Sequence, residues 1–330
     1  MKKTILITGG SSGIGYQATL SLISSGHKLI IPCKDENTCR NTLKKIKTES
    51  NDDIDASRFC EFLVMDLSDL NSVKAFAEKI KQSYLHIDCL ILNAGLQYTG
   101  SKIPRRSEQG IELTFAINHL AHYFLTTNVL NKVLKAPCPR IIITSSEVHN
   151  PDSSGGRVGK KAGLGGLKGF ELENEFDMLD GSKPFSADKA YKDSKLCNIL
   201  FAKELKKRVK DINSDTSVIA WAPGLVIPRS DDGFFRYSRK YNELGQKIFA
   251  FIARDVLRIT ETTIKAGNIL AKLAISDKYQ KSGFSYYSNT LTNFSEYRFQ
   301  EVEPSDESRD CQLAKLLWQK SSQLISQKMN

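Results

Sequence analysis

The sequence lacks the features that would place it in a membrane, cross-link it or bind a metal. None of its apolar runs approaches the roughly 18–20 residues that a transmembrane helix needs. Its seven cysteines are odd in number and show no C-x-x-C pair, so we expect reduced thiols, mostly in the core. The five histidines are scattered, and only His119 and His122 lie close together, as helix residues. We therefore expect a cytoplasmic protein without a metal ion.

No block of five like charges occurs, although the formal net charge is +10. A surplus of positive charge that is spread along the chain argues against a nucleic-acid partner. It is compatible with an acidic small molecule or an anionic membrane surface as a partner. The 330 residues are 40 % hydrophobic, which is enough to bury a sizeable core.

Short apolar runs alternate with segments of helical periodicity. The runs cover residues 4–9, 28–34, 59–69, 86–95, 139–146 and 216–224, with a seventh candidate at 282–289. Strands that are apolar throughout and alternate with helices indicate a parallel sheet covered on both faces. We predict an α/β fold, a Rossmann-like doubly wound parallel sheet, as one domain over residues 1–330. A long irregular insertion is expected at about 150–188, and a lid or extension at about 225–260.

The segment TGGSSGIG, from Thr8 to Gly15, joins the first run to the first helical segment. Gly9, Gly13 and Gly15 have the spacing G-x-x-x-G-x-G. Glycines at a strand-to-helix turn let the backbone approach a pyrophosphate, whose charge meets the helix N-terminus. The placement predicts a dinucleotide site, and an ordinary glycine turn is the alternative.

The end of the second run bears on the choice of cofactor. Lys34 ends the run and Asp35 follows it. A cation there favours the 2′-phosphate of NADP, whereas an acidic residue favours the ribose hydroxyl of NAD. With Ser12 as an additional donor we predict NADPH, and a plain surface lysine is the alternative reading of Lys34.

Seven motifs together resemble the short-chain dehydrogenase/reductase family, and they occur in the family's order. They are TGGSSGIG, DLSD at 66–69, NAG at 93–95, Asn118 in INHLAH, ITSS at 143–146, YKDSK at 191–195 and APG at 222–224. The resemblance implies that four residues form the catalytic group, namely Asn118, Ser146, Tyr191 and Lys195. It also implies a cofactor-binding set, namely Gly9, Ser11, Ser12, Gly13, Ile14, Gly15, Lys34, Asp66, Leu67, Asn93, Ala94, Gly95, Tyr191, Lys195, Pro223 and Gly224.

Physical chemistry agrees with the roles of Tyr191 and Lys195. A tyrosine with a pKa near 10 is a poor proton donor or acceptor at neutral pH. A lysine one helical turn away lies on the same face, and its charge lowers the cost of the phenolate. Ser146, at the end of a strand, can orient a substrate oxygen. Taken alone, Tyr191 and Lys195 would also fit an exposed helix pair.

Tyr191 lies 45 positions after Ser146, farther than in most of the family, and the residues between them resemble the insertion of light-dependent protochlorophyllide oxidoreductases. That resemblance implies hydride transfer from NADPH to protochlorophyllide, a tetrapyrrole, with the proton supplied by Tyr191. It assigns Cys197, Ser146 and Phe234 to the substrate, although Cys197 also fits simple packing. The chain departs from the pattern where it has NAG and APG followed by Leu225.

Two other functions stay open. YKDSKLCNILF is also similar to light-independent short-chain reductases of lipophilic carbonyls such as retinal, and a catalytically idle NADPH-binding protein is possible. After Gly224, four residues spaced by four predict an apolar helix stripe, namely Leu244, Ile248, Ile252 and Val256. The stripe fits packing on the sheet, a lid over a flat ligand, or peripheral contact with a membrane, including a photosynthetic one. A homo-oligomer is left open.

Overall fold

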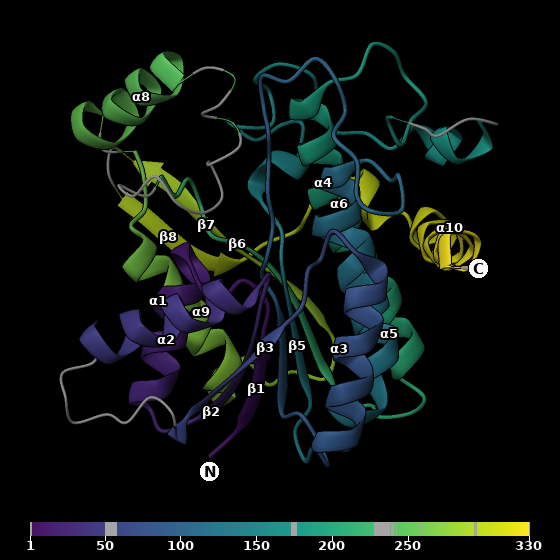
Figure 1. Ribbon diagram of the computed structural model, residues 1–330. Coiled ribbons are helices and arrows are strands. Elements are labelled where there is room, and N and C mark those ends of the chain that lie inside the picture. Colours follow the sequence, from purple (N-terminus) through teal and green to yellow (C-terminus); the bar gives the residue numbers. More distant parts are fainter. Residues whose placement is uncertain are drawn as a thin grey trace.

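A computed structural model of the chain, which describes residues 2–49, 58–172, 177–227, 238, 241, 243–257, 259–293 and 296–329, has an eight-stranded sheet at its centre (Figure 1). The strands are β1 Thr4–Ile7, β2 Lys28–Cys33, β3 Cys60–Val64, β4 Cys89–Leu92, β5 Arg140–Thr144, β6 Ser217–Ala222, β7 Phe284–Asn293 and β8 Glu296–Glu301. Their order is β3-β2-β1-β4-β5-β6-β7-β8. Neighbours pair in parallel except β7 and β8, which are antiparallel. The predicted doubly wound parallel sheet is confirmed.

Helices cover both faces of this sheet (Figure 1). The α-helices of the described residues are α1 Gly13–Ser24, α2 Glu36–Glu49, α3 Leu70–Ser83, α4 Leu113–Phe115, α5 Ala121–Leu134, α6 Ala187–Val209, α8 Glu243–Phe251, α9 Thr263–Ile275 and α10 Cys311–Met329. One face is covered by α1, α2 and α9, and the other by α3, α5, α6 and α10. A π-helical turn, Ala116–Leu120, joins α4 to α5.

The apolar runs of the sequence form strands because each strand is buried on both faces. Side chains alternate between the faces along a strand. Leu6 of β1 accordingly packs with α3 and α5, whereas Ile5 and Ile7 pack with α1 and α9. Seven strands lie where the sequence predicts them. The eighth, β8, is missing from the prediction because it is an antiparallel edge strand whose residues are exposed or half-buried.

The carboxyl ends of the parallel strands meet at one edge of the sheet, which is where ligands bind in open α/β folds. The strand order reverses between β1 and β4, and the glycine turn leads from β1 into α1 at that edge. The fold therefore places the predicted motifs on one rim.

The apolar stripe forms a helix as predicted, but it is not packed on the sheet. It runs through α8 into a π-helical turn, Ile252–Val256. The exposed fractions of its side chains are 71 % at Leu244, 50 % at Ile248, 43 % at Ile252 and 58 % at Val256. The packing interpretation is therefore wrong. Among the helices of the described ranges, none is long and apolar enough to cross a bilayer.

Candidate functional site

The glycine turn after β1 combines tight internal packing with an open approach for a ligand. Gly15 is required by packing, because a Cβ added there would lie 2.1 Å from the carbonyl oxygen of Gly9. Gly13 has φ +55°, and a Cβ added there would meet nothing within 4 Å. The first turn of α1 contains no acidic residue, and its N-cap Ser12 makes no capping bond through its side chain. The turn therefore fits a pyrophosphate at the N-terminus of α1.

The end of β2 supplies one exposed cation and one carboxylate that is already engaged. Asp35 accepts hydrogen bonds from the backbone N–H of Thr38 at 2.7 Å and from its hydroxyl at 2.8 Å. These bonds hold the pKa of Asp35 below its ordinary value. Lys34 is 56 % exposed, and its ammonium lies 3.5 Å from the carboxylate of Asp66. Asp35 and Lys34 are thus both exposed, and each has a partner, Thr38 for Asp35 and Asp66 for Lys34.

The rest of the predicted cofactor set follows the carboxyl ends of β1, β3, β4 and β6. Most of these residues are half-buried, namely Gly9, Ser11, Ser12, Ile14, Asp66, Leu67, Asn93, Ala94, Gly95, Pro223 and Gly224. Gly224 has φ +83°, and a Cβ there would lie 2.6 Å from the ring of Tyr297. The structure therefore brings these positions to one rim of the sheet.

Helix α6 places Tyr191 and Lys195 one turn apart. The Lys195 ammonium lies 5.6 Å from the centre of the Tyr191 ring, and it donates to the carbonyl oxygen of Thr144 at 3.3 Å. Lys195 is 3 % exposed, and burial lowers its pKa to about 8. A lysine held this way is close to the midpoint of its titration at mildly alkaline pH.

The Ser146 side chain lies close enough to the Tyr191 phenol to influence its pKa, so the structure brings these two predicted residues together. Burial raises the pKa of Tyr191 above its ordinary value, Ser146 lowers it and Asp188 raises it further. The net direction is upward, so the predicted lowering of this pKa by Lys195 is not what the structure shows. The phenol is therefore a protonated group at neutral pH.

Asn118 lies in the π-helical turn, and its side-chain amide is hydrogen-bonded to other residues of the protein. Its Oδ1 accepts from the N–H of Leu96 at 2.8 Å. Its Nδ2 donates to the Leu96 carbonyl and to the Ser194 hydroxyl, each at 3.0 Å. Asn118 is thus a positioning residue that links the end of β4 to α6.

The remaining charged residues of the KAYKDSK segment attach the insertion to α6. Lys192 is 2 % exposed, pairs with Asp188 at 3.0 Å and donates to the carbonyl of Lys160 at 2.9 Å. Lys189 donates to the carbonyl of Gly163 at 2.6 Å and pairs with Asp193 at 2.7 Å. The N-terminal half of α6 thus holds the insertion and presents Tyr191.

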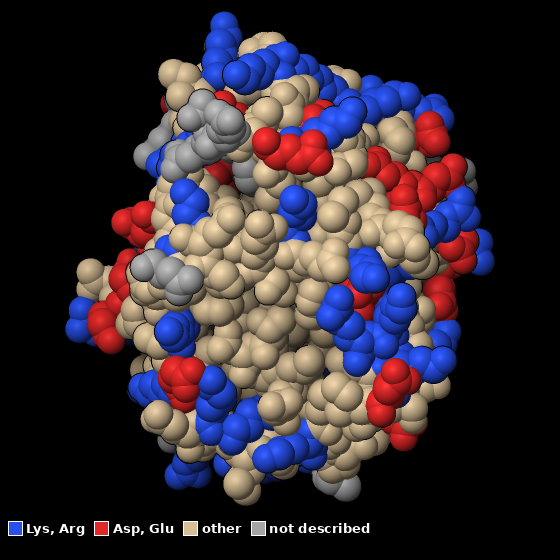
Figure 2. Space-filling model, turned by 90° about the vertical axis from the view of Figure 1, so that its right-hand side faces the viewer, with Lys and Arg blue, Asp and Glu red and all other residues tan. Residues whose placement is uncertain are grey.

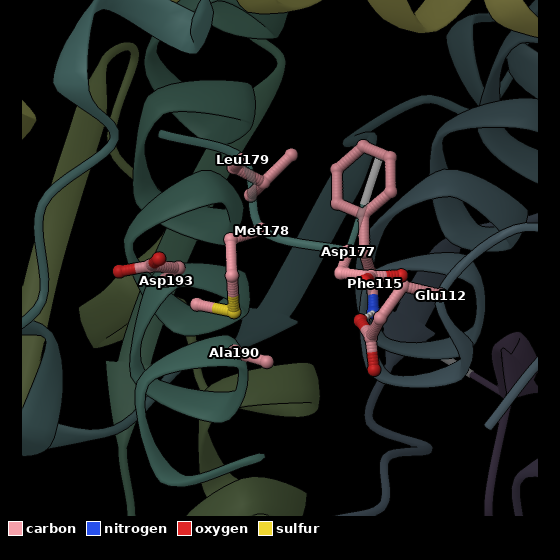
Figure 3. A pocket seen from close by; sticks show the side chains of 7 residues that line it. All are labelled: Glu112, Phe115, Asp177, Met178, Leu179, Ala190 and Asp193. Atoms are coloured by element: carbon pink, nitrogen blue, oxygen red, sulfur yellow. Dashed lines mark hydrogen bonds between the residues drawn. The ribbon is translucent and has the colours of Figure 1, made fainter. Parts of the chain in front are cut away.

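A small hollow lies between α4, α6 and the insertion (Figure 3). It is lined by Glu112, Phe115, Asp177, Met178, Leu179, Ala190 and Asp193. Glu112 is bonded to Tyr98 and to the amides of Thr114 and Phe115, and Asp193 is bonded to Lys189. Since both of these carboxylates have partners, the hollow does not present them to a ligand.

Of the two further predicted substrate residues, the structure describes one, Cys197. Cys197 is fully buried in the hydrophobic core under α6, and burial raises its pKa well above the ordinary value. The structure therefore supports packing for Cys197, because its side chain faces the core. Phe234 lies outside the described residues. All seven cysteines are free.

Sequence reasoning missed three residues that organise the site. Thr8 accepts from the amides of Asn93 at 2.9 Å and Ala94 at 3.0 Å. Glu147 accepts hydrogen bonds from Ser288 and Thr290 of β7, directly after Ser146. His122 was read as an ordinary helix residue and contacts Thr8. Thr8 and Glu147 stand inside or beside recognised motifs, which is the one signal that could have found them.

Comparison with known proteins places these motifs in a family. Residues 3–158 match the family model described as short chain dehydrogenase. The protochlorophyllide reductase of Chlamydomonas reinhardtii is 31 % identical, over 98 % of this chain and 78 % of that protein. The WW domain-containing oxidoreductase of Drosophila melanogaster is 32 % identical, over 98 % and 69 %.

Solved structures share the fold. A protein of unknown function from Mycobacterium paratuberculosis has a TM-score of 0.67 at 24 % identity, covering 98 % of this chain and 93 % of that one. A short chain dehydrogenase from Shigella flexneri, complexed with NADP, has a TM-score of 0.58 at 19 % identity, covering 86 % and 95 %. Because relatives 31–32 % identical align with nearly the whole chain, this protein belongs to the short-chain dehydrogenase/reductase family of oxidoreductases.

Proposed function

We propose that this oxidoreductase uses NADPH to reduce protochlorophyllide to chlorophyllide in a light-dependent reaction. The observation that supports a reductase is the grouping of Ser146 beside Tyr191 with Lys195 one turn away, at the rim that carries the glycine turn. The substrate is suggested by protochlorophyllide reductases that match nearly the whole chain, including the insertion before Tyr191.

The residues at the rim fit NADPH. The open face of Gly13 and the N-terminus of α1 would hold the pyrophosphate. Lys34 would pair with the 2′-phosphate, since Asp35 is engaged at the start of α2. When bound, the cofactor supplies the hydride.

The chain's own groups would supply the proton and hold the substrate. Tyr191 keeps its proton at neutral pH, because burial raises its pKa, and its Oη is the proton donor in this proposal. Ser146 lies beside that phenol and would orient the substrate. The Lys195 ammonium, near the ring, would stabilise the phenolate left after transfer. Asn118 fixes the end of β4 against α6.

A second candidate is light-independent reduction of a lipophilic carbonyl. Two observations favour it. Cys197 is buried in the core rather than placed at the site, and the WW domain-containing oxidoreductase is at least as similar to this chain as the protochlorophyllide reductases are. A catalytically idle NADPH-binding protein is the third candidate, and the complete Ser–Tyr–Lys set counts against it.

The deciding experiment mixes purified protein with NADPH and protochlorophyllide and records absorbance in darkness and after illumination. We expect chlorophyllide only after illumination. Dark reduction of retinal, with no reaction of the pigment, would support the second candidate, and NADPH binding without either reaction the third. The variant Tyr191→Phe tests the proton donor. It should bind NADPH like the wild type, and its turnover should fall about 10²–10⁴-fold. Unchanged turnover would show that Tyr191 is not the proton donor.

Surface features support further proposals about partners and location. The exposed stripe on α8 would allow a cytoplasmic protein to touch a membrane peripherally, including a photosynthetic one. On the face that shows α3, α5 and α10, uncharged residues occupy the centre and charged residues surround it (Figure 2). Such a face would suit a homo-oligomer. A tetrapyrrole is the proposed small-molecule partner, and no nucleic acid is proposed.

A further inference from the structure

His122 is a buried histidine in the first turn of α5 that contacts two parts of the site. Its Nε2 lies 2.9 Å from the hydroxyl of Thr8, and its Nδ1 lies 3.1 Å from the backbone carbonyl oxygen of Asn118. Its exposed fraction is 2 %. Thr8 begins the glycine turn, and Asn118 belongs to the motif set of the reaction centre. One imidazole ring therefore spans the two parts.

The partners determine which nitrogen carries the proton. The Asn118 carbonyl can only accept a hydrogen bond, so the Nδ1 of His122 must donate. In a neutral ring Nε2 is then an acceptor, so the Thr8 hydroxyl donates to it. That hydroxyl accepts from the amides of Asn93 and Ala94, which agrees with its role as donor toward His122. A competing acceptor, the carbonyl of Ile91, is farther away, at 3.4 Å.

The surroundings keep the ring neutral. Burial and, to a smaller extent, the nearby Lys195 ammonium together lower the pKa of His122 to about 4. A charged imidazole would lie close to that ammonium without a carboxylate among its hydrogen-bond partners. His122 is thus unsuited to proton transfer at neutral pH and suited to a fixed structural link.

We propose that His122, as the neutral Nδ1–H tautomer, is a positioning residue that ties the Thr8 hydroxyl of the glycine turn to the Asn118 carbonyl. The inference rests on the proposed use of a nicotinamide cofactor. Thr8 also holds the amides after β4, and Asn118 holds Leu96 and Ser194. The imidazole therefore sets the cofactor turn and the start of the reaction centre in one arrangement.

His119 provides a matched control three residues earlier. It is equally buried, but its Nε2 lies 3.1 Å from Ser321 of α10, and its ring packs against Phe115 and Phe201. It joins α10 to the core, and among the described residues the hydrogen bonds of the imidazole to Thr8 and to the Asn118 carbonyl belong to His122, not to His119. Substitutions at His119 thus report the cost of losing a buried histidine without disturbing the proposed link.

Two amide substitutions each remove one half of the link. An asparagine amide lies near the Nδ1 position and a glutamine amide near the Nε2 position, so His122→Asn loses Thr8 and His122→Gln loses the Asn118 carbonyl. We expect His122→Asn to raise the Kd for NADPH about tenfold, and His122→Gln to lower kcat about tenfold with little change in that Kd. His119→Asn and His119→Gln should lower the thermal midpoint alone. If the His122 variants also lose only stability, the proposal is wrong.

The tautomer is tested separately by ¹⁵N NMR of the imidazoles in the wild-type protein, with His122→Gln used to assign the signals. We expect a proton on Nδ1 and none on Nε2 between pH 6 and 8. A proton on Nε2, or a charged ring, would overturn the inference. This measurement needs neither NADPH nor substrate. A wild-type protein that fails to bind NADPH would contradict the proposed function while the spectrum still decides the tautomer.

Discussion

At the scale of single residues, the buried ammonium of Lys195 makes activity depend on pH. Burial lowers the pKa of this lysine from 10.5 to about 8, because the charged form loses hydration. A rate that needs the ammonium beside Tyr191 will therefore fall as pH rises through about 8. We expect an alkaline limb there in the pH profile of kcat, and Lys195→Arg, which stays charged, should move that limb upward. A profile that is flat to pH 9 would show that the reaction does not need this charge.

The same shift has an opposite effect on folding. Between pH about 8 and the unfolded value of 10.5, the unfolded chain binds more protons than the folded chain at this site. The contribution of Lys195 to the free energy of unfolding therefore increases with pH across that window. Activity and stability should diverge there, which separates loss of the ammonium from general unfolding.

Lys34 is expected to decide between the two nicotinamide dinucleotides. It is the accessible cation at the end of β2, whereas the neighbouring Asp35 is bonded to Thr38. Lys34→Ala should raise the Kd for NADPH about tenfold and leave the Kd for NADH nearly unchanged, because only NADPH carries the 2′-phosphate. Isothermal titration with both cofactors measures this difference.

The matched control is Lys28→Ala. Lys28 is an exposed lysine at the opposite end of the same strand, so its removal changes net charge equally without touching the rim. Equal losses of NADPH affinity in both variants would point to general electrostatics instead of a specific contact.

At the scale of elements, α6 carries Tyr191 and also binds the insertion at residues 155–163. Lys192 binds the insertion by donating to the carbonyl groups of Val158 and Lys160, and it also pairs with Asp188 of its own helix. Lys192→Met should release residues 155–163 and cost about 1–3 kcal/mol, since the charge-assisted bonds are lost. Limited trypsin digestion, read by mass spectrometry, should show faster cleavage at Arg157, Lys160 and Lys161.

Lys207→Met, on an exposed position of the same helix, is the control and should digest like the wild type. If the Lys192 variant resists trypsin equally well, the insertion is held by contacts other than this lysine.

The elements also show where sequence reasoning succeeds. Strands such as β1 and β4 are almost entirely apolar because both of their faces are buried. The sequence therefore predicts that they are buried strands. The half-buried pattern of β8 carries no such signal, because an edge strand pairs on one side only. The exposed face of α8 could not be foreseen either, since periodicity shows that a helix is two-sided but not what covers its apolar side.

At the scale of the whole molecule, one close helix contact supports the glycine turn from outside the sheet. Gly267 of α9 faces α1, and a Cβ added there would lie 2.4 Å from Cβ of Gln17 and 2.8 Å from the amide nitrogen of Ala18. Gly267→Ala must therefore push the two helices apart, at a cost of about 1–3 kcal/mol. We expect a lower thermal midpoint together with weaker NADPH binding, because α1 carries the turn at its N-terminus.

Gly283→Ala supplies the comparison, since a Cβ there would meet nothing within 4 Å. Its thermal midpoint should stay close to that of the wild type. A Gly267 variant that unfolds like the wild type would mean that the helices tolerate the extra methyl group.

The whole chain also shows the reach of motif reading at the site. Tyr191, Lys195 and Ser146 could be predicted because their order, and the four-residue spacing of Tyr191 and Lys195, resemble those of a family, and the structure brings the three residues together. For Cys197 the sequence left substrate contact and packing open, because its position in a motif says nothing of the direction in which its side chain points, and the structure buries it in the core. His122 and Glu147 depend on partners far away in the sequence, which only the folded chain brings close.

Thr144 is a single junction between four parts of the protein. Its carbonyl oxygen accepts from Lys195 and Asn198, while its hydroxyl donates to Asn93 and accepts from Trp221. These four bonds tie the tips of β4, β5 and β6 to the middle of α6. Substitutions that change substrate specificity would therefore be tolerated best in the surrounding loops. The residues that carry out the reaction would then keep their positions.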